Sequence, residues 1–510
     1  MIDRTEVGRA LRAAAANRAY SGPFPEHPTN GEETSYPYLA NSSKGLPHDE
    51  VGEVDPRAYQ ALLRALATGR PEDFERIPLG VDSGGRKLLN PQGGLAFDLE
   101  GFDTHGLAIP PAPRMDGAEN SAEMAELYWM ALMRDVRFTD FDEAAIAAEA
   151  ADDLSTFSDF RAPKEDGRVT PCTLFRGFTP GDLVGPYISQ FLLRDVQFGT
   201  LGIPHRHDTV ETGVNYMTHF DEWLAVQRGA PRGLRPGDRD TVNTRYLQTP
   251  RDMAHYTHFD VLYQPYLNAC LILLGMGTSP AELQDVGNPY RISANQTGFT
   301  TFGTPHIVGL LAEVANRAIR TTEYQQFFVH RRQRPEEFGG RIEIQLSRDP
   351  GRYDGIIDSE ILNTDVLKRT KEKFGSYLLP QAFPEGSPMS PAYHSGHACV
   401  AGTCVTVLKA WFNESYPIRN PVVPDEAGTA LVPYNGPDKD RLTVGGELNK
   451  LAANIGNGRN MGGVHWRTDY REAFTLGEAI AIGILRDQKP TTNEDATFTV
   501  TRFDGTTITI

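Results

Sequence analysis

Long helical patterns dominate the second half of this chain. Apolar residues recur at helical spacing from residue 252 to 275. They recur again in a helix that we expect to have Thr304 as its cap and Pro305 at its first position and to reach Val329. Three further patterns start at Ser395, cover 446–455 and run from 469 to 485. Such helices must bury their broad apolar faces against one another, so they predict a bundle, and the interior of a bundle can hold a polar site.

The first half has shorter helical patterns and longer interruptions. Residues 21–58 have little periodicity, so we expect an arm that lies across its own or a neighbouring subunit. Residues 497–510, with Asp504-Gly505 at their centre, predict a β-hairpin. Helical patterns cover 56–68, 121–135, 142–157 and 186–193. We predict a mainly α protein, one compact unit made of an arm and helical half (1–250), a C-terminal helical bundle (251–490) and a hairpin tail (491–510).

Charge and hydropathy exclude some classes of function. The 510 residues carry a formal net charge of −17, which argues against nucleic-acid and anionic-membrane binding because both need clustered Lys and Arg. No window holds eighteen uninterrupted apolar residues, so we expect no membrane span. Residues 1–20 predict a short polar helix without the apolar core of a signal peptide, so we expect a cytoplasmic protein; a processed exported form would look the same.

A small polar motif opens the helix predicted from Ser395. Ser395 can cap that helix, Gly396 lets a ligand approach backbone N–H groups, and His397 lies in the first turn, where it can exchange a proton. Taken alone, such a motif is more often a helix cap followed by a surface histidine. Its meaning therefore depends on the rest of the chain.

Two other clusters hold arginine and histidine. The basic run 330–336 ends a predicted helix and is, by itself, typical of a solvated end that complements the helix dipole. In 458–469, Arg459 and His465 are six positions apart and Asp469 follows four later. An arginine fork, a histidine that can attack or ligate, and a carboxylate that orients the histidine would together suit a tetrahedral oxyanion.

In combination, these residues resemble the three-part signature of a known superfamily. Arg334-Pro335, the 395–397 motif, and Arg459 followed by His465 and Asp469 are similar to motifs shared by the type 2 phosphatidic acid phosphatases and the vanadium-dependent haloperoxidases. The wider match is to the algal and bacterial bromoperoxidase-like branch of the haloperoxidases. Further segments that resemble this branch are 43–48, 52–55, 89–92, 95–98, 299–306, 329–336 and 461–467.

The resemblance implies an all-α fold of two four-helix bundles, with vanadate in the C-terminal one. His465 then matches the axial vanadium ligand, and Arg334 and Arg459 match arginines that bind the vanadate oxygens. The implied reaction uses hydrogen peroxide to oxidise halide to a hypohalous species, with the metal as a Lewis acid. The other matches are Ser395 and Gly396, which would hydrogen-bond the oxyanion, and His397, which would act as acid–base on bound water or peroxide.

Three positions depart from the family pattern. The family has a lysine seven or eight positions before the first arginine, and we take Gln326 as its equivalent. Glutamine donates a hydrogen bond but brings no charge. Losing one charge-assisted contact from a buried anion site costs on the order of 1.5 to 3 kcal/mol of binding free energy, or roughly ten- to a hundredfold in affinity. Ser390 stands where bromoperoxidases usually have histidine, so halide preference cannot be transferred directly. His394 replaces the usual proline and either supplies an extra titratable donor or points to solvent.

Three functions remain open from the sequence. The first is a haloperoxidase acting on bromide or iodide rather than chloride, with peroxide, halide and an organic acceptor as partners. The second is a phosphomonoesterase that binds phosphate in the same site, with His465 as nucleophile and His397 as general acid. The third is an oxyanion-binding homologue without turnover. The arm and the resemblance also predict a homo-oligomer, a dimer or larger.

Overall fold

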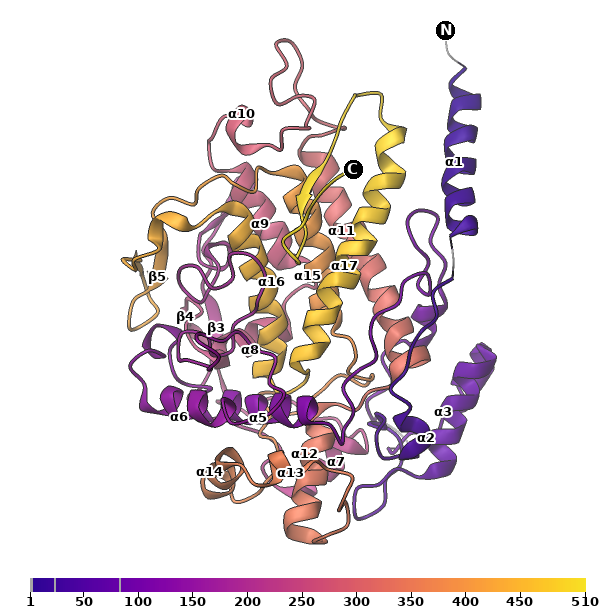
Figure 1. The fold of residues 1–510 in the computed structure, drawn as a ribbon, viewed down its shortest axis with the longest axis vertical. Coiled ribbons are helices and arrows are strands. Elements are labelled where there is room, and N and C mark those ends of the chain that lie inside the picture. The colour runs from indigo at the N-terminus through magenta and orange to yellow at the C-terminus, as the bar shows by residue number, and fades with distance from the viewer. Residues whose placement is uncertain (1–2, 23, 82–83) are drawn as a thin grey trace.

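The computed structural model describes residues 3–22, 24–81 and 84–510, with the side chains of 240–242 left out. Helices make up most of the ordered structure, and the strands in this part of the chain form two-stranded antiparallel sheets (Figure 1). The predicted mainly α fold is therefore confirmed. Among the described residues, no helix combines the length and hydropathy needed to cross a bilayer.

A bundle of four long helices forms the centre of the second half. They are α11 (Thr304–Glu323), α15 (Gly396–Trp411), α16 (Val444–Met461) and α17 (Arg467–Gln488). Helix α15 packs against the other three and is buried from Ala398 to its end. Close approach of α15 and α17 requires glycine, because a Cβ on Gly402 would lie 2.6 Å from the Phe474 carbonyl oxygen. Helix α8 (Pro250–Phe259) packs on α16, and α9 (Gln264–Leu274) packs on α11 and α15.

A second group of helices packs around α5 (Ala118–Leu132), which is buried from Asn120 to Leu132. The group also contains α6 (Ala145–Leu154), α13 (Ser359–Leu362) and α14 (Asp365–Phe374). One continuous hydrophobic core includes residues of both halves of the chain. The division at residue 251 stays a prediction.

The remaining elements are short or peripheral to this core. The other helices are α1 (Arg4–Ser21), α2 (Glu32–Ser35), α3 (Pro56–Thr68), α4 (Pro71–Phe74), α7 (Phe220–Gln227), α10 (Pro280–Leu283) and α12 (Pro335–Glu343). The strand pairs are β1 (Val196–Phe198) with β2 (Leu201–Ile203), β3 (His207–Val210) with β4 (Arg239–Arg245), β5 (Val422–Pro424) with β6 (Leu431–Pro433), and β7 (Thr499–Thr501) with β8 (Thr507–Thr509). The last pair confirms the predicted C-terminal hairpin.

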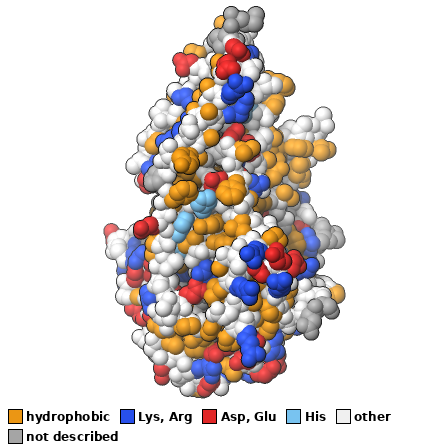
Figure 2. Space-filling model, turned by 90° about the vertical axis from the view of Figure 1, so that its right-hand side faces the viewer, with side chains coloured by type: hydrophobic (Ala, Val, Ile, Leu, Met, Phe, Trp, Pro, Cys, Tyr) orange, Lys and Arg blue, Asp and Glu red, His pale blue; other side chains and the backbone are white. Residues whose placement is uncertain are grey.

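The N-terminal arm packs partly on its own chain. Residues 40–46 are buried, and the Ser42 N–H donates to the Arg331 carbonyl at 2.8 Å. The Lys44 ammonium pairs with Glu336 and donates to the Ser387 carbonyl at 2.8 Å. Helix α1, in contrast, buries no residue and projects from the body (Figure 1). Figure 2 shows basic side chains exposed on this projection at the top of the molecule.

Three predicted helices differ from the observed ones. The helix predicted at 186–193 is wrong: only a single 3-10 turn, Gln190–Leu192, forms there, because side chains of α16 accept the hydrogen bonds of backbone N–H groups. The helix predicted from 252 to 275 is split into α8 and α9, since Pro265 lacks the N–H that a continuous helix would use. The helix predicted to reach Val329 is α-helical only to Glu323 and continues as a π-helix, Tyr324–His330. The N-cap of α11 is Gly303, so the predicted cap, Thr304, is wrong by one residue.

Candidate functional site

The predicted site residues lie at one end of the four-helix bundle. Ser395 is the N-cap of α15, Arg459 lies in the last turn of α16, and Asp469 in the first turn of α17. Gln326 lies in the π-helix that continues α11, and Arg334 is the N-cap of α12. Segments far apart in the sequence therefore meet where several helices begin or end, so unpaired backbone groups are available there.

Arg334 connects the three motifs. Its Nε donates to the Ser390 carbonyl at 2.8 Å and its Nη2 to the Ser390 hydroxyl at 2.9 Å. Its Nη1 donates to the Val464 carbonyl at 2.9 Å and faces His465 Nε2 at 2.8 Å. The guanidinium is thus held against the imidazole by its other hydrogen bonds.

His465 is held by Asp469. The Nδ1–H of His465 donates to Asp469 Oδ2 at 2.8 Å, and that oxygen also accepts from the Trp466 N–H at 3.0 Å. Burial, followed by the nearby charge of Arg334, lowers the pKa of His465 well below its usual range. The imidazole is therefore neutral, with Nδ1 protonated and Nε2 unprotonated. The Nε2 lone pair accepts from Arg334 Nη1, and it can act as a nucleophile or a metal ligand when that donor turns to a bound group.

The N-terminus of α15 supplies backbone donors and a second histidine. The Ser395 hydroxyl accepts from the Ala398 N–H at 3.4 Å, which is cap geometry, and the Ser395 N–H donates to the Asp469 carbonyl at 3.1 Å. In the described part of the chain, the N–H groups of Gly396 and His397 have no hydrogen-bond acceptor. His397 Nε2 lies 3.0 Å from Asp260 Oδ1. The helix start can therefore donate to an anion next to a carboxylate-bound imidazole.

Arg334 and Arg459 give the site its positive charge. Both side chains are fully buried, and burial lowers the pKa of each to about 10, so both remain charged at neutral pH. Neither forms an ion pair with a carboxylate among the described residues, and Arg459 Nε has no hydrogen-bond partner there. Neighbouring Arg332 and Arg467 do pair with buried carboxylates. Two buried guanidiniums that form no ion pair among the described residues fit a bound oxyanion, and vanadate has the required shape and charge.

Gln326 and His394 contact each other beside this site. The Gln326 Nε2 donates to the His394 carbonyl at 2.7 Å, so one of its two amide protons is already engaged. His394 is fully buried rather than directed to solvent. Burial lowers its pKa to about 4, and its Nε2 has no partner in the described structure. His394 is therefore a neutral ring with an uncommitted nitrogen.

Two acidic residues that the sequence analysis missed also belong to the site. Asp260 lies in the break between α8 and α9, 137 positions before its partner His397, and no spacing rule connects the two. Glu323, the last residue of α11, is 6% exposed, and burial raises the pKa of its carboxyl to about 8. At neutral pH this carboxyl is uncharged, so it does not cancel the charge of nearby Arg334.

Replacing Glu323 with glutamine should stabilise the protein relative to wild type, by an amount that grows as the pH rises. The folded-state pKa of about 8 lies above the ordinary 4.5, so stability associated with the neutral carboxyl is fully present below pH 4.5 and is lost as the pH rises through 8. Glutamine avoids that loss, which for a pKa raised from 4.5 to about 8 is on the order of 5 kcal/mol. Thermal unfolding of both proteins across this range measures it. Glu313→Gln, on the same helix in an ion pair with Arg317, is the control; an equal pH trend there would contradict the assignment.

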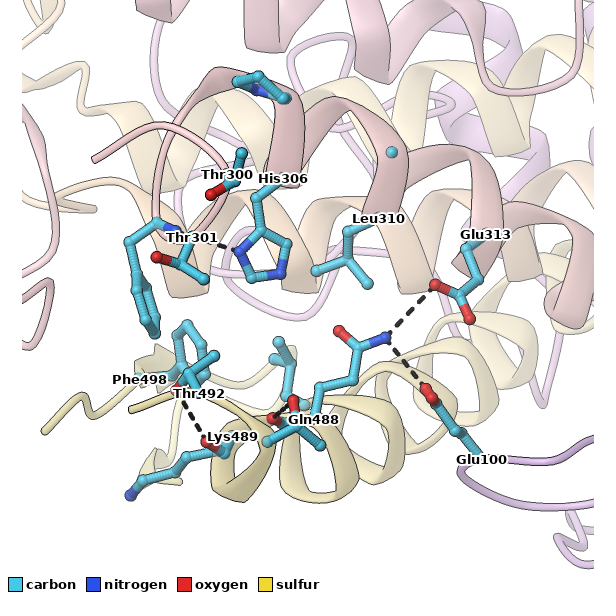
Figure 3. A pocket seen from close by; sticks show the side chains of 15 residues that line it. Glu100, Thr300, Thr301, His306, Leu310, Glu313, Gln488, Lys489, Thr492 and Phe498 are labelled. Atoms are coloured by element: carbon cyan, nitrogen blue, oxygen red, sulfur yellow. Dashed lines mark hydrogen bonds between the residues drawn. The ribbon is translucent and has the colours of Figure 1, made fainter. Parts of the chain in front are cut away.

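A separate pocket of about 450 Å³ lies at the opposite end of α11. In Figure 3, His306 and Leu310 face Gln488 of α17, and Gln488 donates to Glu100 and Glu313. Helix α11 has 20 residues and is therefore about 30 Å long. None of the predicted site residues lines this pocket.

Comparison with known proteins gives concordant matches. Residues 362–491 match the family model described as the VCPO second helical-bundle domain. The chain is 35% identical to the vanadium-dependent bromoperoxidase of Corallina pilulifera, over 99% of this chain and 98% of the relative. It is 34% identical to that of Ascophyllum nodosum, over 99% and 92%. The homohexameric structure of the second vanadate-dependent bromoperoxidase of Ascophyllum nodosum matches 99% of this chain and 90% of its own, with a TM-score of 0.93 and 31% identity.

Proposed function

The chain belongs to the vanadium-dependent haloperoxidases, and we propose that the residues around His465 form its vanadate site. The enzyme uses hydrogen peroxide to oxidise halide to a hypohalous species, and vanadate is its cofactor. In this assignment His465 Nε2 would be the metal ligand, and the residues that would hold the oxyanion oxygens are Arg334, Arg459, Ser395, Gly396 and Gln326. The observation that carries the assignment is the pair of fully buried arginines, neither of which forms an ion pair with a carboxylate in the described part of the chain.

When bound, vanadate supplies a Lewis acid that polarises peroxide without changing its own valence. The chain supplies charge, orientation and proton transfer. Arg334 and Arg459 offset the negative charge of the oxyanion inside a buried site, where such charge is otherwise costly. Asp469 keeps the proton on His465 Nδ1 and so keeps Nε2 unprotonated, as a metal ligand must be.

His397 is the residue we assign to proton transfer. Its side chain is 21% exposed, whereas Asp260, which it contacts, is 1% exposed. Contact with solvent lets the imidazole exchange protons, and the hydrogen bond to the carboxylate fixes the orientation of the ring. Oxidation of a halide to a hypohalous acid by peroxide consumes one proton, and His397 is placed to deliver it.

Bromide is the halide we propose, because the relatives described above are named bromoperoxidases. Ser390 is linked to the site through Arg334, because its hydroxyl accepts the Arg334 Nη2 hydrogen bond, and we propose that it affects halide choice through this contact. An organic acceptor remains a proposal without an assigned pocket.

Peroxide-dependent bromination tests the function. Purified protein is loaded with orthovanadate and assayed with bromide, peroxide and a phenol reporter; the same protein without vanadate is assayed with p-nitrophenyl phosphate. We expect bromination that depends on vanadate and peroxide. No bromination with rapid phosphate release would overturn the proposal in favour of a phosphomonoesterase, and inactivity in both assays would favour an oxyanion-binding homologue.

Phosphate is the second oxyanion that we propose for this site. It shares the tetrahedral shape and the negative charge that the two arginines recognise. Gln326, which carries no charge, favours neither anion by electrostatics. Competition between inorganic phosphate and vanadate for the loaded protein measures this shared occupancy.

We also infer that the protein forms a homo-oligomer, an inference supported by the homohexameric relative. The number of copies is a further proposal. The exposed α1, which buries nothing in its own chain, is a candidate contact between copies. Light scattering of the full chain measures the number of copies, and light scattering of a chain without residues 1–22 tests whether α1 contributes to the contact between them. Cytoplasmic location stays a prediction.

A further inference from the structure

A buried network behind His465 contains an arginine outside the oxyanion set. Arg332 lies two positions before Arg334, and the pair brackets the His465–Asp469 hydrogen bond. Arg334 Nη1 faces His465 Nε2 at 2.8 Å on one side. On the other side, Arg332 Nη1 donates to Asp469 Oδ1 at 2.9 Å. The two arginines thus contact opposite ends of the same imidazole–carboxylate pair.

The rest of the Arg332 guanidinium is also engaged. Its Nη2 donates to Asn120 Oδ1 at 2.9 Å and to Glu123 Oε2 at 3.2 Å, both on α5. Its Cζ lies 4.5 Å from the centre of the Trp466 ring. The side chain is 4% exposed. A planar fork with several donors meets this arrangement, whereas a lysine ammonium does not have the geometry to do so.

The contact restricts Asp469 to one orientation. Its Oδ2 accepts from both His465 Nδ1 and the Trp466 N–H, and its Oδ1 accepts from Arg332. A carboxylate fixed through both oxygens fixes the imidazole plane and the tautomer with it. Arg332 also offsets the negative charge of Asp469, which would otherwise repel an anion bound one imidazole away.

We propose that Arg332 is a positioning residue for the oxyanion site: it fixes and neutralises Asp469 so that His465 presents an unprotonated Nε2 to the central atom of the bound anion. This inference rests on the proposed function. Because Gln326 brings no positive charge to the site, offsetting the negative charge of Asp469 through Arg332 matters more for binding an anion. Among metal sites, loss of a partner that orients a ligand typically weakens metal affinity roughly ten- to a hundredfold.

Arg467 provides a matched control. It is fully buried at the first position of α17 and pairs with Glu126 on α5, one turn from the Glu123 that Arg332 contacts. Its recorded hydrogen bonds go to Glu126, Arg176 and Tyr470, not to Asp469. Arg332→Gln and Arg467→Gln therefore each remove one buried cation between α5 and α17, and only the first removes a contact with Asp469.

The test compares vanadate affinity, measured by equilibrium dialysis, with thermal stability in the full-length variants. We expect Arg332→Gln to weaken vanadate binding about tenfold or more, and Arg467→Gln to lower the unfolding temperature while changing affinity less than about twofold. Arg332→Lys, which keeps the charge but not the fork, should fall between wild type and Arg332→Gln and keeps the test informative if the glutamine variant does not fold. Equal affinity in wild type and Arg332→Gln, or equal weakening in both glutamine variants, would overturn the inference.

A second readout separates this inference from the proposed function. NMR of labelled histidine in vanadate-free protein reports the His465 Nδ1 proton, which should be protected from exchange in wild type and in Arg467→Gln and should exchange faster in Arg332→Gln. If wild type neither binds vanadate nor brominates, the proposed function fails while this readout still supports or rejects the role of Arg332. An unchanged Nδ1 proton in Arg332→Gln rejects it.

Discussion

Alanine in place of His465 is expected to abolish vanadate binding and, with it, bromination. His465 Nε2 is the unprotonated ring nitrogen in the buried site, because Nδ1 is committed to Asp469. Removing it deletes the proposed bond between protein and metal, so affinity should fall by more than the roughly ten- to hundredfold that loss of an orienting partner costs. Equilibrium dialysis with vanadate and the bromination assay measure the two losses.

The control for His465→Ala is His306→Ala. His306 lies at the other end of α11, beside the pocket of Figure 3, and its removal should leave both vanadate affinity and bromination within about twofold of wild type. Because His465 packs against Arg334, the unfolding temperature of His465→Ala must also be recorded. A folded His465→Ala protein that retains vanadate with wild-type affinity would show that the metal is bound elsewhere.

The bundle could be predicted from sequence because its helices carry strong periodicity and recognisable caps. Ser395 caps α15 as predicted, and the helices begun near 446 and 469 form, each longer than predicted. The helix predicted through residue 275 failed for a local reason: Pro265 restarts the chain as a new helix. That break places Asp260 next to His397, so the incorrect helix boundary concealed a residue of the site.

The roles of the arginines in the basic run after residue 330 could not be predicted from sequence, because their side chains point in different directions in the fold. Arg331, with a φ of 45°, turns the chain and pairs with Glu33 of the arm. Arg332 points to Asp469, and Arg334 points to His465. Three identical side chains within four positions thus have three different partners. Spacing identified the run as basic, but only the folded backbone assigns each arginine to its carboxylate or to the oxyanion site.

Burial decides the charge of the site in a way that composition does not predict. The chain is acidic overall, with a net charge of −17, yet the site keeps two charged arginines. Nearby, burial raises the pKa of Asp469 to about 7 and that of Glu323 to about 8, so at neutral pH both carboxyls oppose an anion less than fully ionised ones would. The local potential follows from desolvation and pairing of individual groups.

Lysine in place of Gln326 should tighten vanadate binding by roughly ten- to a hundredfold, the difference that one charge-assisted contact makes in a buried site. The Gln326 amide reaches the His394 carbonyl at 2.7 Å, at the residue directly before Ser395. A lysine side chain is one atom longer and adds a third positive charge beside Arg334 and Arg459. Its ammonium has three donors, so it can keep a bond to the carbonyl and still donate to an oxyanion oxygen.

Gln326→Met separates charge from shape in this experiment. Methionine has a similar length but no donor, so it should leave vanadate affinity at or below the wild-type value, whereas lysine should raise it. Vanadate dialysis at low and high salt provides the measurement; a buried charge should keep most of its effect when salt is added, because screening acts mainly on exposed charges. Equal affinity for the lysine and methionine variants would mean that residue 326 does not face the oxyanion, and that the site relies on Arg334, Arg459 and the start of α15 alone.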